Sequence, residues 1–398
     1  MGESGAAAHR PLSGIRVLDL TNVLAGPFCC HQLAHLGADV VKVEAPSGDL
    51  ARQLGQDEAL SAAGMGISFL APNAGKRSIA LDLKTPGGRR VLERLARGAD
   101  VLVENFRPGV MERLGVGPER LREINPRLIY CAISGFGRDG AMSGRPAYDQ
   151  IVQGLSGAMA ITGSEESGPL RAGWPVADTV GGLTAAMAVC AALNAWPRGC
   201  LIDVSMLDSL MATMGWAVSN LLVGGVHPRP AGNENLTSAP SAAYACADGL
   251  LNIAANEQAQ WERLARHLGL ERLLDDPRFA TRLDRKRNRN VLNGLIGAAL
   301  STKTAAEWER ELSEIGVPAG RVLDLEEALE HPRARDQIAR YDVAGREVEL
   351  MRTGLHIDGE APSVEAPPPT LAEHAEEILG EAGFDAAEVA ALREEGAI

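Results

Sequence analysis

The first 140 residues alternate between short β-rich runs and stretches with helical spacing, and this alternation restricts the chain to few fold classes. Residues 14–20 and 39–44 are rich in Val, Leu and Ile, which favours strands. Residues 28–36 between them have the spacing of a helix, and Gly37 marks its end. A strand, a helix and a second strand in this order predict a βαβ unit with parallel strands.

The same alternation continues to residue 134. Residues 77–83 and 100–106 are predicted strands, and the helix between them begins at Pro86 behind the capping residue Thr85. Another short helix and a strand at 127–134 follow. We therefore predict an α/β fold with a mostly parallel sheet, helices on its faces, and ligands beyond the carboxyl ends of the strands.

Beyond this region the chain becomes apolar, and its amino-acid composition then changes. Residues 182–222 are nearly all apolar, apart from a turn at 196–200 and a short strand at 201–205. Helices that are apolar on most sides are usually buried, so we expect the helices here to be buried. After Gly224 the composition shifts to Pro, Gly, Asn and Ser up to residue 241, which indicates passage into a second domain.

The second domain is predicted to begin with a hairpin at 244–255 around Asp248-Gly249, followed by amphipathic helices. A proline-rich connector at 361–369 and a last helix at 371–379 come after it. The predicted boundaries are a large domain that begins with 1–223, a smaller α+β domain at 224–335, and a C-terminal segment at 336–398 that returns to the large domain.

Net charge and cysteine usage exclude several classes of function. The chain has 39 Lys and Arg against 52 Asp and Glu, a net charge of −13, which is opposite to that of a typical nucleic-acid binder. Its six cysteines are scattered without a Cys-x-x-Cys pair, as in a reducing cytoplasm. We see neither a secretion signal nor an unbroken membrane span. We expect a cytoplasmic protein without nucleic-acid or membrane partners.

Two motifs resemble cofactor or metal sites but are incomplete. Residues 135–140 fit G-x-G-x-x-G after a strand, yet the Ser-Gly-Arg-Pro sequence that follows breaks the helix that a nicotinamide or flavin site needs. His31 and His35 have a spacing that could bind zinc, but no third ligand stands at the usual distance. We therefore predict no metal and no tightly bound cofactor.

Basic residues gather at predicted strand ends and turns of this acidic chain: Lys76, Arg77, Lys84, Arg107 and Arg113. Loops at strand ends of a parallel sheet bind anionic ligands, so a phosphate-rich ligand is one interpretation. A solvated basic patch is the other, and charge alone does not separate the two.

Asp178 lies just before Gly181-Gly182 and a long apolar helix. A carboxylate is stabilised at a helix start, and the glycines allow another group to approach closely. An N-cap aspartate explains this residue, and a carboxylate nucleophile is the chemical alternative.

Ordered motifs along nearly the whole chain resemble the class III CoA-transferase family, which includes formyl-CoA transferase and carnitine CoA-transferase. They are residues 11–27, 37–46, 75–84, 103–109, 145–149, 176–178, 203–208, 316–320 and 371–374. The resemblance implies a Rossmann-like large domain, a smaller domain, and two subunits interlocked as a ring-like homodimer.

The resemblance also implies site residues. Asp178 falls on the catalytic aspartate, which forms an aspartyl-CoA thioester, and the substrates are an acyl-CoA and a small carboxylic acid. Positions that contact CoA in the family fall on Leu24, Ala25, Leu81, Lys84, Asn105, Phe106, Arg107 and Arg113. Tyr148 and Asn22 are expected to line the acid pocket.

This chain departs from the family at two places. Some members have Arg where this chain has Ala45, and the glycine-rich loop that covers the site of formyl-CoA transferase is replaced by Ala-Ala-Asn-Glu-Gln at 254–258. These departures count against formyl-CoA as donor and leave the role of 254–258 as a lid open. By analogy we expect succinyl-CoA as donor and a short dicarboxylate as acceptor.

Alternative functions make different predictions. An acyl-CoA racemase of the same superfamily uses a histidine in a Gly-His-Asp segment, where this chain has Ala147-Tyr148-Asp149 and no histidine between His35 and His227. A non-catalytic CoA-ester-binding protein would bind the thioester without exchange that depends on Asp178. A hydride-transferring enzyme would bind nicotinamide.

Overall fold

The computed structural model describes residues 10–195, 197 and 199–398, which form two compact units. The larger unit comprises Met1–Met159, Arg171–His227 and Arg335–Ile398, and the smaller comprises Ala160–Leu170 and Pro228–Ala334. The predicted boundary puts residues 160–170 in the large domain, but they belong to the smaller unit, where the backbone amide of Gly232 donates to the carbonyl of Gly163. The predicted turn at 196–200 includes Trp196 and Arg198, which lie outside the described residues.

The larger unit is built on a six-stranded sheet in the order β3-β2-β1-β4-β5-β6, with every neighbouring pair parallel. The strands are β1 (Arg16–Asp19), β2 (Asp39–Glu44), β3 (Arg77–Ala80), β4 (Val101–Glu104), β5 (Ile129–Ser134) and β6 (Cys200–Ser205). In the register of the central strand, Val17 lies opposite both Val40 and Val101. The order reverses between β1 and β4, as in Rossmann-like sheets, and the predicted parallel α/β sheet is confirmed.

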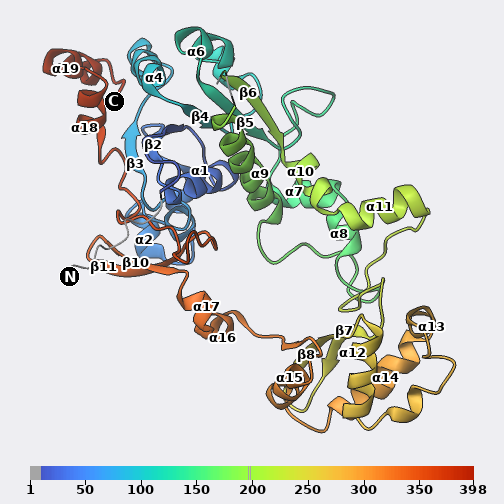
Figure 1. The fold of residues 1–398 in the computed structure, drawn as a ribbon. Coiled ribbons are helices and arrows are strands. Elements are labelled where there is room, and N and C mark those ends of the chain that lie inside the picture. The colour runs from blue at the N-terminus through green and yellow to red at the C-terminus, as the bar shows by residue number, and fades with distance from the viewer. Residues whose placement is uncertain (1–9, 196, 198) are drawn as a thin grey trace. The chain divides into compact units, whose positions relative to one another are not determined.

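Helices cover both faces of this sheet (Figure 1). One face packs against α1 (Ala25–His35), α7 (Asp149–Leu155), α9 (Val176–Leu193) and α10 (Met206–Thr213). The other packs against α4 (Pro86–Gly98), α5 (Val110–Arg113), α6 (Pro118–Ile124), α18 (Ala375–Glu381) and α19 (Ala386–Glu394). Successive strand residues alternate between the two cores: Val17 faces one and Leu18 the other. A sheet buried on both faces explains why its strands read as continuous apolar runs.

The start of α4 shows how local sequence fixes an element. The Thr85 hydroxyl accepts a hydrogen bond from the amide of Gly88, and Pro86 occupies the first turn, as predicted. The opposite end of the chain was predicted less well. The last helices begin at Ala375 and Ala386 instead of residue 371, and an antiparallel hairpin of β10 (Ile338–Val343) and β11 (Arg346–Met351) precedes them. Tyr341 of this hairpin is buried in a small core with Leu70.

The remaining elements of the larger unit are short. They are η1 (Leu50–Gln53), α2 (Glu58–Ala62), α3 (Ile67–Leu70) and α11 (Gly215–Gly224), with α8 (Ala158–Ile161) and α17 (Pro332–Arg335) at the boundaries with the smaller unit.

Helix α11 contradicts the expectation that the apolar stretch up to residue 222 is buried. None of its residues is buried, and Trp216 and Val223 are more than four-fifths exposed. Helix α9 is long and apolar enough to cross a membrane, but it packs along α1 and against the sheet. The prediction therefore holds only for the face of α9 that packs on α1 and the sheet, since Leu183 and Met187 on this helix are at least half exposed. It fails for α11, because no described element of the larger unit covers this helix.

The smaller unit has a three-stranded antiparallel sheet in the order β7-β8-β9, backed by helices. Its elements are β7 (Ser241–Ala245), β8 (Leu250–Ala254), α12 (Gln258–His267), η2 (Glu271–Leu273), α13 (Arg282–Arg287), α14 (Arg289–Leu300), α15 (Ala305–Glu314), β9 (Ala319–Arg321) and α16 (Leu325–Glu330). The predicted hairpin is β7–β8. Trp261 and Trp308 lie in the core between the helices and the sheet.

Candidate functional site

A cavity of about 200 Å³ opens where β1, β2, β3 and β4 end. Its lining includes four predicted side chains from three separate segments, namely Asn22, Leu81, Lys84 and Phe106. Ala45, the position at which the sequence departs from some relatives, also lines it. Carboxyl ends of parallel strands at a reversal of strand order are the usual ligand site of such sheets. The structure therefore brings these residues together where the fold predicts a ligand.

The loop that leads from β1 into α1 forms one wall of the cavity and is held in place by buried polar groups. Asn105 at the end of β4 uses both ends of its side-chain amide: Nδ2 donates to the carbonyl of Asn22 and Oδ1 accepts from its amide, each at 2.8 Å. Leu24 and Ala25 follow in the same loop, and Ala25 is the first residue of α1. The polar atoms of Asn105 thus hold the loop in addition to any ligand contact.

Three basic residues at this end of the sheet are exposed: Lys84, Arg107 and Arg113. Within the described part of the chain, none of them forms an ion pair. Cations left unpaired beside a cavity are suited to binding anionic groups such as phosphates.

Two other basic residues of the predicted cluster serve the fold instead. Lys76 is fully buried and forms an ion pair with Asp19 at 2.8 Å. Arg77 begins β3 at the opposite, amino end of the sheet, and pairs with Asp39, Glu377 and Glu381. For Lys76 and Arg77 neither the phosphate site nor the solvated patch applies, because carboxylates already compensate their charges.

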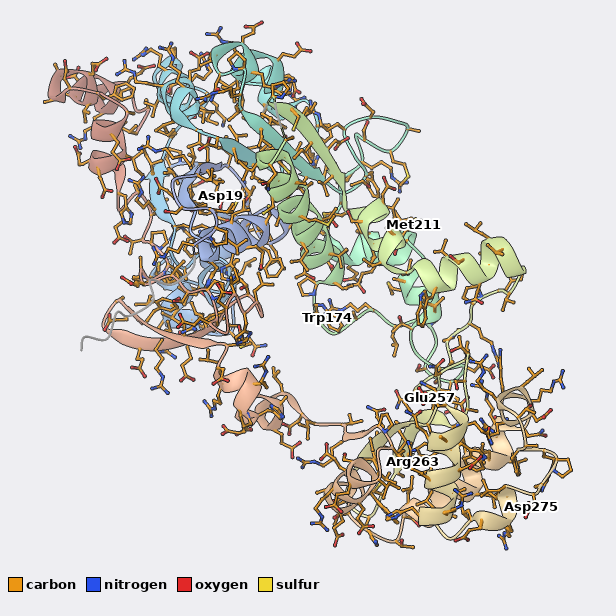
Figure 2. All side chains as sticks on the ribbon, viewed as in Figure 1. Asp19, Trp174, Met211, Glu257, Arg263 and Asp275 are labelled. Carbon is orange, nitrogen blue, oxygen red and sulfur yellow. The ribbon has the colours of Figure 1, made fainter. Side chains whose placement is uncertain are left out.

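Buried charges surround the β1–α1 loop. Lys42 and Asp49 are fully buried and lie 3.1 Å apart, and Asp19 lies inside the sheet (Figure 2). Burial opposes ionisation of Asp19, but the charges of Lys76 and Lys42 outweigh it and lower its pKa to about 2. Sequence reasoning missed this network, since charged residues at strand ends usually lie in solvent.

Asp178 is the third residue of α9, and Trp174 lies on the loop that leads into this helix (Figure 2). The N-cap position is Pro175, so the explanation of Asp178 as an N-cap is wrong. Asp149 takes that role from the start of α7: its Oδ1 accepts from the amide of Ala177 at 2.7 Å and from that of Asp178 at 3.4 Å. The Asp178 carboxylate itself is half-buried, and no donor of the described chain bonds to it.

Burial, with a further contribution from the charge of Asp149, raises the pKa of Asp178 to about 7. Gln153 fixes the neighbouring carboxylate by donating to Oδ2 of Asp149 at 2.6 Å. A carboxylate with a raised pKa, without a hydrogen-bond donor and partly open to solvent is more basic and less solvated than a surface aspartate. These properties suit a nucleophile or a proton acceptor.

A glycine one turn after Asp178 explains how α9 reaches the β1–α1 loop. A Cβ on Gly182 would lie 2.5 Å from the carbonyl oxygen of Ala25, so only glycine allows this approach. The helix that carries Asp178 and the loop that carries Leu24 and Ala25 are therefore packed directly together.

Tyr148 precedes α7 and is 68% exposed, and it does not line the cavity with Asn22.

The loop at 135–140 has no helix behind its glycines, since the next helix begins at Asp149. Its Arg138 instead pairs with Glu112 and lies 3.7 Å from Glu104. Burial raises the pKa of Glu104 to about 7. These contacts give the loop a structural role between β4 and α5.

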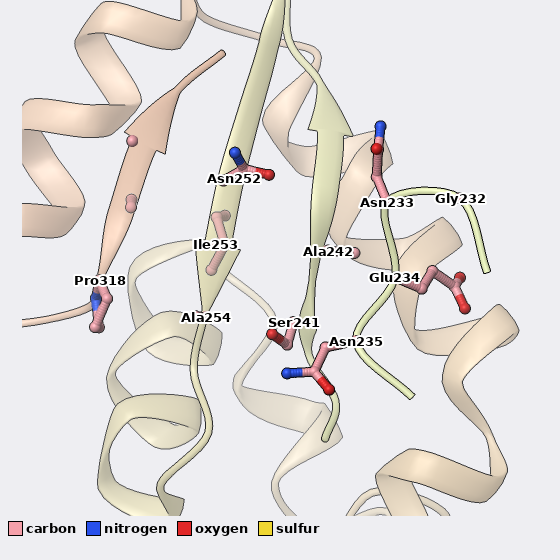
Figure 3. A pocket seen from close by; sticks show the side chains of 12 residues that line it. Gly232, Asn233, Glu234, Asn235, Ser241, Ala242, Asn252, Ile253, Ala254 and Pro318 are labelled. Carbon is pink, nitrogen blue, oxygen red and sulfur yellow. The ribbon is translucent and has the colours of Figure 1, made fainter. Parts of the chain in front are cut away.

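The smaller unit has a cavity of about 590 Å³ that the sequence did not predict (Figure 3). Its lining comes from residues 232–235 and from the edges of β7, β8 and β9, and includes Asn233, Asn235 and Asn252. Segment 254–258 joins β8 to α12 beside it and is fixed at its far end, where Glu257 and Gln260 form a capping box and Arg285 donates to Gln258.

Comparisons with known proteins show which family and which proteins the chain is similar to. The model of CoA-transferase family III matches residues 12–375. The chain is 38% identical to a succinate–glutarate CoA-transferase of Agrobacterium fabrum, over 93% of this chain and 95% of the relative. It is 40% identical to an acetyl-CoA:oxalate CoA-transferase of Acetobacter aceti, over 81% of this chain and 83% of that protein. The crystal structure of a CaiB/BaiF family protein from Brucella suis has a TM-score of 0.82 at 34% identity, over 94% of this chain and all of that one.

Proposed function

Because the chain belongs to CoA-transferase family III and is a CoA-transferase, we propose that it moves CoA from succinyl-CoA to a short dicarboxylic acid, with Asp178 as the nucleophile. The observation that carries the assignment of Asp178 is its half-buried carboxylate, with a pKa of about 7 and no bonded donor among the described residues, at the start of α9.

The chemistry proceeds by exchange of acyl groups. The Asp178 carboxylate attacks the thioester carbonyl of the donor, which forms a mixed anhydride and releases CoA thiolate. The thiolate then attacks the Asp178 carbonyl, which gives an aspartyl-CoA thioester and frees the donor acid. The acceptor carboxylate attacks this thioester, and the same two steps in reverse order produce the new acyl-CoA and regenerate Asp178. No acyl bond is hydrolysed, so its energy is kept throughout.

The cavity at the strand ends supplies contacts for CoA. Leu81 and Phe106 offer apolar surface, and Lys84, Arg107 and Arg113 lie, without an ion pair in the described chain, where phosphates would be compensated. Leu24 and Ala25 lie beside α9, so the pantetheine is expected to pass along this loop towards Asp178.

The proposed donor and acceptor acids are inferred from the names of the relatives. One acts on succinate and glutarate by name and another on oxalate, so a dicarboxylate is common to both. A relative named for succinate supports succinyl-CoA as donor, whereas the second relative names acetyl-CoA. Tyr148 and Asn22 are the residues we assign to acceptor recognition.

We also propose that the active form is a homodimer of interlocked subunits, in which a partner covers α11. The exposed apolar side chains Trp216, Leu222 and Val223 support this, since single chains rarely leave such a face in water. Because interlocked subunits cannot separate by dilution, Leu222→Asp should act on assembly, and a smaller fraction of the freshly made chain should sediment as dimer than for the parent chain. A variant that assembles into dimer as completely as the parent chain would count against α11 as part of the interface.

The test of the proposed function is intact-protein mass after mixing with succinyl-CoA or acetyl-CoA, followed by hydroxylamine. We expect a CoA-sized adduct or a hydroxamate on Asp178, none in Asp178→Ala, and a normal adduct in the control Asp139→Ala, which alters an exposed aspartate. The donor that reacts identifies the acyl group, and acids that discharge the adduct identify the acceptor.

Two other outcomes would overturn the proposal. Exchange of the α-proton of a branched acyl-CoA in heavy water, without an adduct, would indicate the racemase. Binding of CoA thioesters without either reaction would indicate a non-catalytic CoA-ester-binding protein.

A further inference from the structure

We propose that Asp49 and Lys42 are positioning residues for the CoA site, which hold the loop of Thr21, Asn22 and Val23 in a strained shape before CoA binds. This inference rests on the proposed function for its ligand, and on the geometry of the loop for everything else.

The loop is strained at one residue. Val23 has a φ of 65°, in the left-handed region. A β-branched side chain rarely adopts this conformation, and such outliers persist only where the surroundings enforce them. Val23 lies between Asn22, which lines the cavity, and Leu24, a predicted CoA contact.

Three consecutive residues of the loop are each fixed by a different side chain. Lys42 Nζ donates to the carbonyl of Thr21 at 2.9 Å. The side-chain amide of Asn105 holds both backbone groups of Asn22. The amide of Val23 donates to both carboxylate oxygens of Asp49, at 3.0 and 3.2 Å.

Asp49 and Lys42 also hold each other. Their side chains are fully buried and paired at 3.1 Å, and the amide of Ala51 donates to the same aspartate. A fully buried carboxylate has few alternative partners, so the energy of its bonds is available to keep Val23 strained. Pre-formed loops bind ligands without the entropic cost of ordering.

The decisive experiment pairs Asp49→Asn with Val23→Gly. Glycine adopts positive φ at little cost, so a loop with Gly at position 23 no longer needs the carboxylate. Asparagine at position 49 has a single acceptor oxygen, and its NH2 group would face either Lys42 or the backbone amides that Asp49 now accepts from. We therefore expect Asp49→Asn to raise the KM for succinyl-CoA about tenfold, the order of magnitude of one strained residue, with little change in kcat. Adding Val23→Gly should return the KM to within about threefold of the parent chain. A residue with a merely structural role would not be rescued in this way.

The matched control is Ala344→Gly, which removes another left-handed non-glycine residue (φ 54°) in the turn between β10 and β11. It should leave the KM unchanged. The proposal is overturned if Asp49→Asn folds normally with an unchanged KM, or if Val23→Gly does not restore it.

Amide hydrogen exchange separates this proposal from the proposed function. In the ligand-free parent chain, the amides of Asn22 and Val23 should be protected like those of β1; rapid exchange there would refute a pre-formed loop even if Asp49→Asn failed to fold. If the parent chain neither transfers nor binds CoA, the proposed function fails. The loop mechanism is still supported if the amide of Asn22 loses its protection from exchange in Asp49→Asn and regains it in the double variant Asp49→Asn/Val23→Gly.

Discussion

Replacement of Asp149 by asparagine tests the electrostatic origin of the reactivity of Asp178. Asp149 Oδ1 accepts from the amides of Ala177 and Asp178, and the asparagine side chain would keep that acceptor while it loses the charge. At the separations of about 4–6 Å over which a like charge acts on a carboxyl, the repulsion is about 3–4 kcal/mol at an effective dielectric constant of about 20. Solvent on the open side of Asp178 reduces this to about 1.4 kcal/mol, or about one pKa unit. Burial remains, so the pKa of Asp178 should fall from about 7 towards about 6.

The assay is the rate of aspartyl-CoA formation in a single turnover, measured from about pH 5 to about pH 9, on either side of that pKa. Ionised Asp178 is the nucleophile, so this rate rises with pH around a midpoint of about 7 in the parent chain and about one unit lower in Asp149→Asn. Gln153→Ala is the matched control, because it breaks the bond between Gln153 and Asp149 but keeps the charge. A midpoint that is unchanged in Asp149→Asn, or that falls equally in Gln153→Ala, would refute the reasoning.

Three further outcomes are expected. In urea unfolding, Asp178→Asn should match the parent chain near about pH 4 and exceed it in stability by about 4 kcal/mol at about pH 8. A carboxyl whose folded pKa is raised to about 7 costs stability as the pH rises from its unfolded pKa to that value, so a difference independent of pH would contradict this. Gly182→Ala should cost about 2 kcal/mol, because its Cβ meets the carbonyl of Ala25, whereas Gly215→Ala, which has open space, should not; equal unfolding midpoints would contradict the packing. Arg107→Ala should raise the KM for succinyl-CoA about tenfold at low salt and less at high salt, with Arg97→Ala as an exposed control, and a loss confined to kcat would argue against phosphate binding.

Local sequence signals were sufficient for the sheet and insufficient for the contacts that tune the site. β-rich runs separated by helical stretches leave little choice except a parallel sheet, and residues after its strands must meet at one edge, as Asn22, Lys84 and Phe106 do. Which charges pair is decided by tertiary packing. Lys76 and Lys84 flank the same strand and look alike in sequence, yet one is buried against Asp19 and the other is exposed.

The same limit applies to Asp178 and α11. Asp149 lies 29 residues before Asp178, and only the packing of α7 on α9 makes it the cap of that helix. Apolar content likewise predicted burial for both α9 and α11, but burial needs a covering surface, and composition does not say which chain provides it.

The parts of the larger unit are synthesised at different times, with the smaller unit between them. Its sheet is completed by Ser205, but the apolar face that contains Leu102 and Tyr130 is closed by Ile378, Leu379 and other residues from the last part of the chain. While the ribosome makes the smaller unit, this face still lacks that part of its cover and offers a binding surface to chaperones. Premature termination before α18 would therefore yield a chain with a complete sheet and a permanently open apolar face, a product prone to aggregation and degradation.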